Sequence, residues 1–233
     1  MCGRFTLTID AKTFEEAMDE TYGLKIDATS HALPRYNIAP GEQVLALIHD
    51  GKTYRLGELK WGMPMKGSGK PLINARAESV HEKPMFKEAF KRRRCLILAD
   101  GYYEWKKTAG NKLPMRILPK SRRLFAMAGV YAPFENEDGT HHYSCAIVTT
   151  AANRDVSMIH HRMPLILSRS DEMDWVHPEN IDRQSLLRSL LVPPAKESLT
   201  HYPVGSIVNN PANDTVDCIQ EVSQKPHTLF DTD

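Results

Sequence analysis

Short apolar runs separated by polar turns dominate this chain, and they predict a protein built mainly from β-strands. Residues 44–62 contain two strand-like segments on either side of Asp50-Gly51, a dipeptide that favours tight hairpins. We therefore expect two antiparallel strands in this region. Similar runs predict further strands over residues 95–100, 102–107, 115–118, 124–131, 143–150, 164–168 and 201–205.

One of these strands, residues 102–107, has two chemically different faces. Successive side chains of a strand point to opposite sides, so Tyr102 and Glu104 share one face while Tyr103 and Trp105 share the other. Glu104 then has two interpretations. It lies in solvent on a polar face, or it is buried among the aromatic side chains, where burial would raise its pKa into a range useful for acid–base chemistry.

Four segments have helical character. A capping box of Thr13 and Glu16 predicts the start of the first helix, and Gly23 predicts its end. The other three helices are expected over residues 84–94, 170–176 and 180–191.

Strands outnumber helices and come in runs, so the regular strand–helix alternation of a parallel sheet is missing. We assign the chain to the α+β class, as one domain over residues 1–233 with a mostly antiparallel, barrel-like β core and peripheral helices. The stretch at residues 66–70, KGSGK, is then interpreted as a flexible loop and not as a linker between domains.

Composition and charge narrow the function classes without selecting one. The 30 Lys and Arg residues nearly balance 29 Asp and Glu residues, so the net charge is +1 and any anion-binding site must be local. None of the 4 cysteines falls in a CxxC pair, so their spacing does not indicate a metal site. No signal segment or apolar run of membrane-spanning length is found. We expect a cytoplasmic monomer that needs no cofactor, metal or membrane.

Cys2, in the opening MCGRF, also has two interpretations. It is a small apolar residue that begins a strand, or Met1 is removed and Cys2 becomes the first residue. In the second case an α-amine, with a pKa of about 7.7–8.0, and a thiol, with a pKa of about 8.5, lie on adjacent carbons. Such a 1,2-aminothiol condenses with an aldehyde to an imine, and the thiol then closes a thiazolidine ring.

Two other polar clusters could belong to the same site. His160 and His161 precede Arg162 where a loop enters a predicted strand, and His is the natural general base near neutral pH. Neighbouring residues of an extended chain point apart, so we expect only one of the two histidines to face a pocket. Asn74 and Arg76 would share a face of an extended segment and could hold an oxygen and a phosphate, although a surface loop explains them equally well.

Several motifs occur together along the chain, followed by the tail VNNPANDTVDCI. They are MCGRF, RYNIAPG, WGMP, PLINARAES, MFKEAF, RRCLILADGYYEWKK, MAGVYAPF and IHHRMPLIL. With these motifs the chain resembles the SRAP family, the SOS response-associated peptidases or abasic-site processing proteins, over nearly its whole length. The resemblance favours the N-terminal nucleophile interpretation of Cys2.

The resemblance implies a function in the DNA damage response, on abasic sites in single-stranded DNA. Cys2, exposed by loss of Met1, would capture the ring-opened sugar aldehyde as a thiazolidine DNA–protein crosslink. Asn74 would steady the sugar oxygen or the amine, and Glu104 would be the acid–base residue. His160 would move protons in ring opening and in β-elimination, which is a lyase activity. Self-removal of Met1 is a secondary, peptidase activity that the family name implies.

The resemblance also implies DNA contacts. Phosphates would be held by Arg4, Arg76 and Arg162, and the pocket floor would be shaped by Asn37 and Pro40.

Two departures from the family pattern affect the site. His161 stands where an acidic residue is expected between His160 and Arg162, which would alter the pKa of His160. The loop at residues 63–70 lacks large aromatic side chains, so stacking on bases beside the lesion would depend on three residues, Trp61, Met63 and Met65.

Two other function classes share some of these features. An amidotransferase with an N-terminal nucleophile also begins with Met-Cys-Gly and would use the thiol to take ammonia from glutamine. A non-catalytic DNA-binding module would bind reversibly and would not depend on Cys2.

Overall fold

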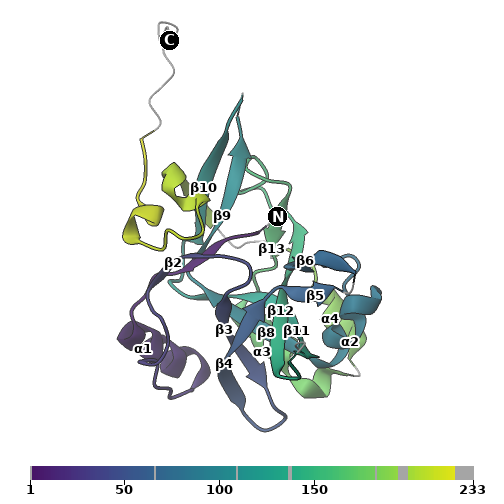
Figure 1. Ribbon diagram of the computed structural model, residues 1–233. Helices are drawn as coiled ribbons and strands as arrows, with labels where there is room; N and C mark the ends of the chain where they lie inside the picture. The colour runs from purple at the N-terminus through teal and green to yellow at the C-terminus, as the bar shows by residue number, and fades with distance from the viewer. Residues whose placement is uncertain are drawn as a thin grey trace, which may run out of the picture.

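A closed barrel of five strands forms the centre of the molecule (Figure 1). The computed structural model describes residues 2–65, 67–108, 110–135, 138–181, 183–193 and 199–223. The barrel strands are β3 (Gln43–His49), β4 (Tyr54–Trp61), β8 (Arg94–Ala99), β11 (Phe125–Glu135) and β12 (His141–Ala151). Around the barrel the order is β11, β8, β3, β4 and β12, and β12 pairs with β11 again. Every pair is antiparallel except β12 with β4.

The barrel interior is filled by apolar side chains from all five strands. β8 is buried along its whole length, which explains why its sequence is a continuous apolar run with no polar alternation. Gly129 of β11 lies opposite Cys95 of β8. A Cβ atom at Gly129 would lie 2.7 Å from the Cys95 sulfur and 2.9 Å from Cδ1 of Ile97. Glycine is therefore required for the close approach of these two strands.

A second sheet of five strands lies beside the barrel, in the order β14, β10, β9, β1, β2. Its members are β1 (Phe5–Leu7), β2 (Arg35–Ile38), β9 (Gly101–Lys107), β10 (Lys112–Pro119) and β14 (Leu199–Pro203). The predicted faces of β9 are confirmed. Tyr102 belongs to the main core, whereas Tyr103 packs in a separate cluster with Val204, Val208 and Cys218.

Four short strands complete the sheets. β7 (Asn74–Arg76) and β13 (Arg162–Pro164) both pair with β12, and β5 (Met63–Met65) pairs with β6 (Ser68–Leu72). The expected loop over residues 66–70 is therefore wrong in part, because β6 begins at Ser68; Lys66 lies outside the described residues. The expected strand over residues 164–168 is also shorter, since β13 ends at Pro164 and only Ile166 continues as an isolated bridge.

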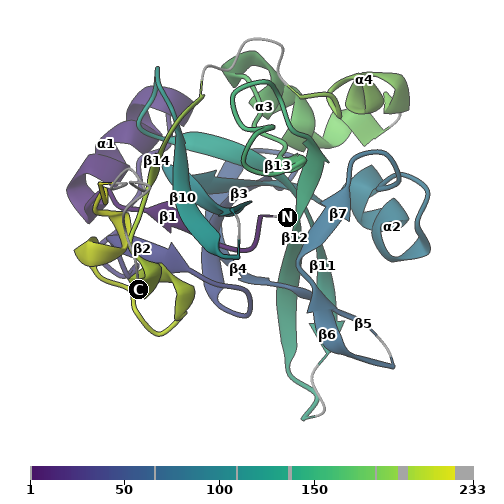
Figure 2. The ribbon, with the colours of Figure 1, turned by 90° about the horizontal axis from the view of Figure 1, so that it is seen from above.

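The helices lie outside the sheets, with α1 and α2 on opposite sides of the barrel (Figure 2). The α-helices among the described residues are α1 (Ala11–Tyr22), α2 (Pro84–Arg92), α3 (Arg169–Val176) and α4 (Gln184–Ser189). Short 3₁₀-helices cover Pro178–Ile181, Ser206–Asn209 and Val216–Ile219. No helix of the described residues is long and apolar enough to cross a membrane.

Two helix predictions need correction. Helix α1 is capped by Asp10, whose carboxylate accepts from the Thr13 backbone N–H at 2.8 Å, so the capping box at Thr13 is wrong. Its predicted end is confirmed, since Gly23 has φ of 61°. The single helix expected over residues 180–191 is wrong, because Arg183, with φ −94° and ψ 51°, separates a 3₁₀ turn from α4. The α+β class and the mostly antiparallel, barrel-like core are confirmed.

Candidate active site

Cys2 lies three residues before the start of β1 and is fully buried. Its backbone carbonyl accepts a hydrogen bond of 2.9 Å from Nδ2 of Asn74, on β7. Oδ1 of Asn74 is buried as well, and no donor reaches it from the described part of the chain. Asn74 therefore joins the N-terminal segment to the barrel and leaves one buried acceptor at the same point.

Glu104 is buried, with 3% of its surface exposed, so the solvent-facing interpretation does not hold. It lies on β9, and β9 pairs with β1, the strand that follows Cys2. In this pairing Phe5 lies opposite Tyr102, two residues before Glu104. Burial raises the pKa of the Glu104 carboxyl. Burial also raises the pKa of the Cys2 thiol, and the negative charge of Glu104 adds to that increase. The carboxyl and the thiol are thus close enough to influence each other.

His160 lies just before β13, and its Nδ1 is 3.9 Å from Oε1 of Glu104. The same nitrogen accepts a hydrogen bond of 3.0 Å from the Arg162 backbone N–H, which requires a lone pair on Nδ1. Burial lowers the pKa of His160. Glu104 and His160 therefore have pKa values shifted in opposite directions, a combination that suits an acid and a base in one site.

The two neighbouring histidines do not point apart as expected. The rings of His160 and His161 stack with centroids 4.3 Å apart and planes 28° apart, because this part of the loop is not extended. His161 is exposed, and the adjacent His160 is the main cause that lowers its pKa. Of these two histidines, His160 lines the neighbouring pocket and His161 does not.

A pocket of about 390 Å³ opens beside these groups. It is lined by Glu104, Trp105, Lys107, Lys112, His160 and Asn209. Nε1 of Trp105 donates a hydrogen bond of 2.7 Å to Oδ1 of Asn209, so the C-terminal segment forms one wall. Three lining residues were not predicted from the sequence: Lys107, Lys112 and Asn209. The two lysines could have been noticed because they flank the turn of a predicted strand pair.

Arg4 and Asn37 are internal structural residues in this fold. Nη1 of Arg4 donates to Oδ1 of Asn37 at 2.7 Å and to the Val208 carbonyl at 2.8 Å. Nδ2 of Asn37 donates to the carbonyls of Asn210 and Asn213, at 3.1 and 2.7 Å. Both side chains are buried and hold the C-terminal segment on the sheet. The expected phosphate contact of Arg4 and the expected place of Asn37 in the pocket floor stay predictions beside these internal contacts.

Three further predicted contact residues, Pro40, Arg76 and Arg162, differ in exposure. Pro40 and Arg76 are exposed, and Arg76 is two residues beyond Asn74 on β7. Arg162 is mostly buried and already forms an ion pair with Glu78, with Nη2 3.0 Å from Oε2. A phosphate at Arg162 would have to displace Glu78, whereas Arg76 presents its side chain on the surface.

Trp61 and Met63 are fully buried, so neither can stack on a DNA base in this structure. Nε1 of Trp61 donates to the Ile73 carbonyl at 2.9 Å, and its ring lies 5.2 Å from that of Phe5. Both residues belong to the hydrophobic core. Of the three expected stacking residues only Met65 is at the surface, with 37% of its area exposed.

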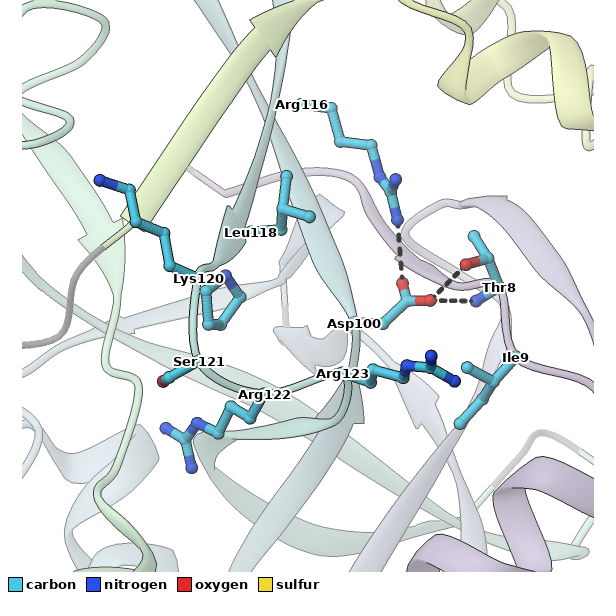
Figure 3. Close-up of a pocket in the computed structure, with 10 residues that line it drawn as sticks. Thr8, Ile9, Asp100, Arg116, Leu118, Lys120, Ser121, Arg122 and Arg123 are labelled. Atoms are coloured by element: carbon cyan, nitrogen blue, oxygen red, sulfur yellow. Dashed lines mark hydrogen bonds and ion pairs between the residues drawn. The ribbon is translucent and has the colours of Figure 1, made fainter.

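A larger cavity, of about 500 Å³, lies at the far ends of β1, β9 and β10 (Figure 3). Asp100 occupies its floor and accepts hydrogen bonds from the Thr8 backbone N–H at 2.6 Å and from Nη2 of Arg116 at 3.4 Å. Figure 3 shows that the Arg123 side chain extends toward Ile9 on the same side. None of the residues predicted for the site lines this cavity. Its charged floor is an internal ion pair, separate from Cys2 and Glu104.

The chemical groups of the candidate site are a thiol, a carboxyl, an imidazole and an amide. The described residues contain no group of three or more His, Cys, Asp or Glu side chains that could hold a metal ion. All four cysteines are free and buried. The arrangement can therefore supply a nucleophile at Cys2, an acid at Glu104 and a base at His160.

Comparison with known proteins places these groups in a family. The family model for the SOS response associated peptidase (SRAP) matches residues 1–211. The abasic site processing protein YoaM of Bacillus subtilis (strain 168) is 39% identical over 225 residues, 94% of this chain and 97% of that protein. The abasic site processing protein YedK of Escherichia coli (strain K12) is 32% identical over 226 residues, 95% and 100% of the two chains.

A solved structure shows the same fold. The X-ray structure of a protein from Bacteroides thetaiotaomicron superposes with a TM-score of 0.78 at 23% identity, over 95% of this chain and 100% of that one. The family match covers most of the sequence, including Cys2, Asn74, Glu104 and His160. The chain therefore belongs to the SRAP family.

Proposed function

We propose that this protein captures abasic sites in single-stranded DNA as a covalent adduct on Cys2. Two relatives that match nearly the whole chain are named abasic site processing proteins. The structural observation that supports the proposal is the meeting of four functional groups from distant parts of the sequence. Cys2 is hydrogen-bonded to Asn74 and electrostatically coupled to Glu104, which lies 3.9 Å from His160.

The proposed chemistry begins with loss of Met1, which gives Cys2 a free α-amine. The amine nitrogen attacks C1′ of the ring-opened sugar, and the resulting carbinolamine loses water to form an imine. Glu104 gives the proton that lets the hydroxyl leave as water. The Cys2 sulfur then adds to C1′, the imine nitrogen takes up a proton, and a five-membered thiazolidine ring closes. No oxidant or reductant is consumed.

The pKa shifts of the three groups suit this sequence of steps. The raised pKa of Glu104 keeps the carboxyl protonated to a higher pH than usual, so it can act as the acid. The raised pKa of Cys2 keeps the thiol protonated, so sulfur attack needs a base. The lowered pKa of His160 keeps its imidazole neutral near physiological pH, so it can take that proton.

We propose strand cleavage and self-removal of Met1 as two finer activities of the same groups. In β-elimination, His160 would take a proton from C2′ of the imine, and the C3′–oxygen bond would break with its electron pair leaving on the phosphate. In self-removal, the Cys2 sulfur would attack the Met1 carbonyl carbon, and the bond from that carbon to the Cys2 nitrogen would break as the nitrogen takes up the thiol proton. Water would then hydrolyse the thioester, which releases methionine and restores the thiol. The position of His160 beside Glu104 supports the first activity.

A denaturing gel of the mature protein mixed with abasic single-stranded DNA tests the main proposal. We expect an adduct that survives denaturation and is absent from Cys2→Ala, whose amine can form only a reversible imine. Glutamine hydrolysis without DNA would instead identify an amidotransferase. If the wild type formed no adduct and Cys2→Ala bound the DNA reversibly as well as the wild type does, the protein would be a DNA-binding module.

A further inference from the structure

Lys107 and Lys112 lie directly opposite each other on the β9–β10 hairpin. The turn between them is closed by a hydrogen bond of 2.9 Å from the Thr108 backbone N–H to the Asn111 carbonyl. Directly opposed residues of antiparallel strands have Cβ atoms about 4.5–5.5 Å apart, and like charges in such a pair are destabilising. The hairpin therefore places two lysine side chains next to each other on one face of the sheet, at some cost in free energy.

Nothing in the described chain neutralises this pair. Both lysines are exposed, and neither forms an ion pair or a side-chain hydrogen bond with another described residue. The one acidic residue that lines the same pocket, Glu104, is buried, whereas both lysines are exposed. The pair is thus a local concentration of positive charge on a chain whose net charge is only +1.

The position of the pair relates it to the reacting groups. Lys107 and Lys112 line the same 390 Å³ pocket as Glu104 and His160, with Trp105 as a further wall. Glu104 and His160 are mostly buried, whereas the lysines are exposed, so the acid and base form the floor and the ammonium groups form the rim. A polyanionic strand that places its sugar on this floor would bring a neighbouring phosphate to the rim.

We propose that Lys107 and Lys112 together bind one phosphate of the DNA strand, a phosphate adjacent to the abasic sugar. The inference rests on the proposed function, because it needs a DNA strand whose lesion lies against Glu104 and His160. A phosphodiester has one negative charge and two non-bridging oxygens, and each oxygen can accept a hydrogen bond from one ammonium group. The anion relieves the repulsion between the lysines, and its binding holds the strand with the abasic sugar at the pocket.

The double variant Lys107→Met, Lys112→Met tests the assignment. Its matched control is Lys12→Met, Lys52→Met, which removes two exposed lysines on α1 and the β3–β4 turn. Binding is measured by fluorescence anisotropy with single-stranded DNA that carries an unreactive tetrahydrofuran lesion. We expect the hairpin variant to weaken binding by roughly 5- to 30-fold at about 0.1 M salt and to reduce the salt slope by about 0.7–1. The control variant should stay within about twofold of wild type.

A second measurement identifies the phosphate. Each of the two phosphates that flank the lesion is replaced in turn by an uncharged methylphosphonate. At one of the two positions, the methylphosphonate should lower the DNA affinity of the wild type but should not lower the affinity of the hairpin variant any further. The reason is that the methylphosphonate and the lysine substitutions remove the same lysine–phosphate contact. The assignment would be overturned if the hairpin variant bound DNA with wild-type affinity. It would also be overturned if, at both positions, the affinity loss from the methylphosphonate were as large in the hairpin variant as in the wild type.

Capture of reactive abasic DNA separates this inference from the proposed function. At saturating DNA, we expect the hairpin variant to form the adduct at a rate within about threefold of wild type, since lysines that act through phosphate binding mainly affect affinity. A wild-type protein that forms no adduct would refute the proposed function. Normal capture by the wild type, together with unchanged DNA affinity of the variant, would refute the phosphate site alone.

Discussion

The side-chain amide of Asn74 donates a hydrogen bond of 2.9 Å to the backbone carbonyl of Cys2. This bond joins β7, a short strand on the barrel, to the segment that carries the proposed nucleophile. The amide oxygen of Asn74 is buried and accepts no hydrogen bond from the described residues, although its Nδ2 donates. An unsatisfied buried acceptor at a reactive residue suits a ligand that brings a donor, such as the α-amine or the sugar hydroxyl in the proposed reaction.

Asn74→Asp should slow adduct formation by about 10- to 100-fold, because an ionised carboxylate cannot donate to the Cys2 carbonyl. The free energy of unfolding should change by only about 1–3 kcal/mol, the cost of one lost hydrogen bond and an added partly buried charge. Single-turnover kinetics and chemical denaturation measure the two effects. Asn74→Gln, which keeps the amide, is the control and should be less impaired. Equal rates for wild type and Asn74→Asp would contradict a role for this hydrogen bond.

Glu104→Gln should slow adduct formation by roughly 10²–10⁴-fold, since the amide cannot supply the proton for loss of water. The pH dependence gives a second test. The pKa of Glu104 is raised by burial, so the active protonated form is present at low pH and disappears as the pH rises through that pKa. The wild-type rate should therefore fall on the alkaline side, and Glu104→Gln should lack this descending limb. Single-turnover rates from pH 5 to 9 measure it, and an unchanged profile would exclude Glu104 as the acid.

Glu104 should also affect the pH dependence of stability. Its raised pKa means that the folded chain binds the proton more tightly than the unfolded chain, whose Glu pKa is about 4.3. This contribution to stability is fully present below the unfolded pKa and is lost as the pH rises through the folded pKa. Denaturation midpoints measured from pH 4 to 8 should fall less in Glu104→Gln than in wild type. Parallel curves for the two proteins would contradict the burial of an ionisable Glu104.

His161→Glu should raise the pKa of His160, because a carboxylate beside the stacked ring favours the imidazolium. The neutral form of His160 is the proposed base, so the acidic limb of the pH–rate profile should move to higher pH. Strand cleavage measured across pH 5–8 tests the shift. The uncharged variant His161→Gln is the control and should leave that limb close to wild type. An identical acidic limb of the pH–rate profile in all three proteins would show that residue 161 does not affect the pKa of His160.

Arg4 and Arg76 should respond differently to substitution. Arg4→Met removes donors to Asn37 and to the Val208 carbonyl, and it should lower the free energy of unfolding by about 2–4 kcal/mol. Arg76→Met alters an exposed residue and should weaken DNA binding by about fivefold with little change in stability. Thermal unfolding and anisotropy distinguish them. A stable Arg4→Met protein with strongly reduced DNA affinity would identify Arg4 as a phosphate ligand.

A short extension before Cys2 that resists cleavage should abolish the stable adduct. The thiol remains, but the amine becomes an amide and cannot form an imine, so only a reversible thiohemiacetal is available. Intact mass after incubation with excess abasic oligonucleotide measures the adduct before and after a protease exposes Cys2. The uncleaved protein should still bind DNA. A stable adduct of the uncleaved protein would rule out the thiazolidine mechanism.

Local sequence patterns were sufficient to predict much of the fold. The β3–β4 hairpin follows from the Asp50-Gly51 turn between two apolar segments. The continuous apolar strand β8 and the two faces of β9 follow from periodicity, because burial of one face imposes a period of two and burial of both faces removes it. The reactive potential of Cys2 also follows from the sequence, since the amine and the thiol that the proposal requires belong to one residue. The motifs around Asn74, Glu104 and His160 are also local sequence features, and they are sufficient to indicate the family.

Only the tertiary structure decided which of the candidate residues are available to DNA. Arg4, Asn37, Trp61 and Met63 have side chains that suit nucleic acid, yet the pairing of distant strands buries all four. Conversely, Lys107 and Lys112 are ordinary surface residues in the sequence and become rim residues only because β9 and β10 pair beside His160. Burial and proximity of this kind depend on contacts between residues far apart in the chain, and local periodicity contains no information on those contacts.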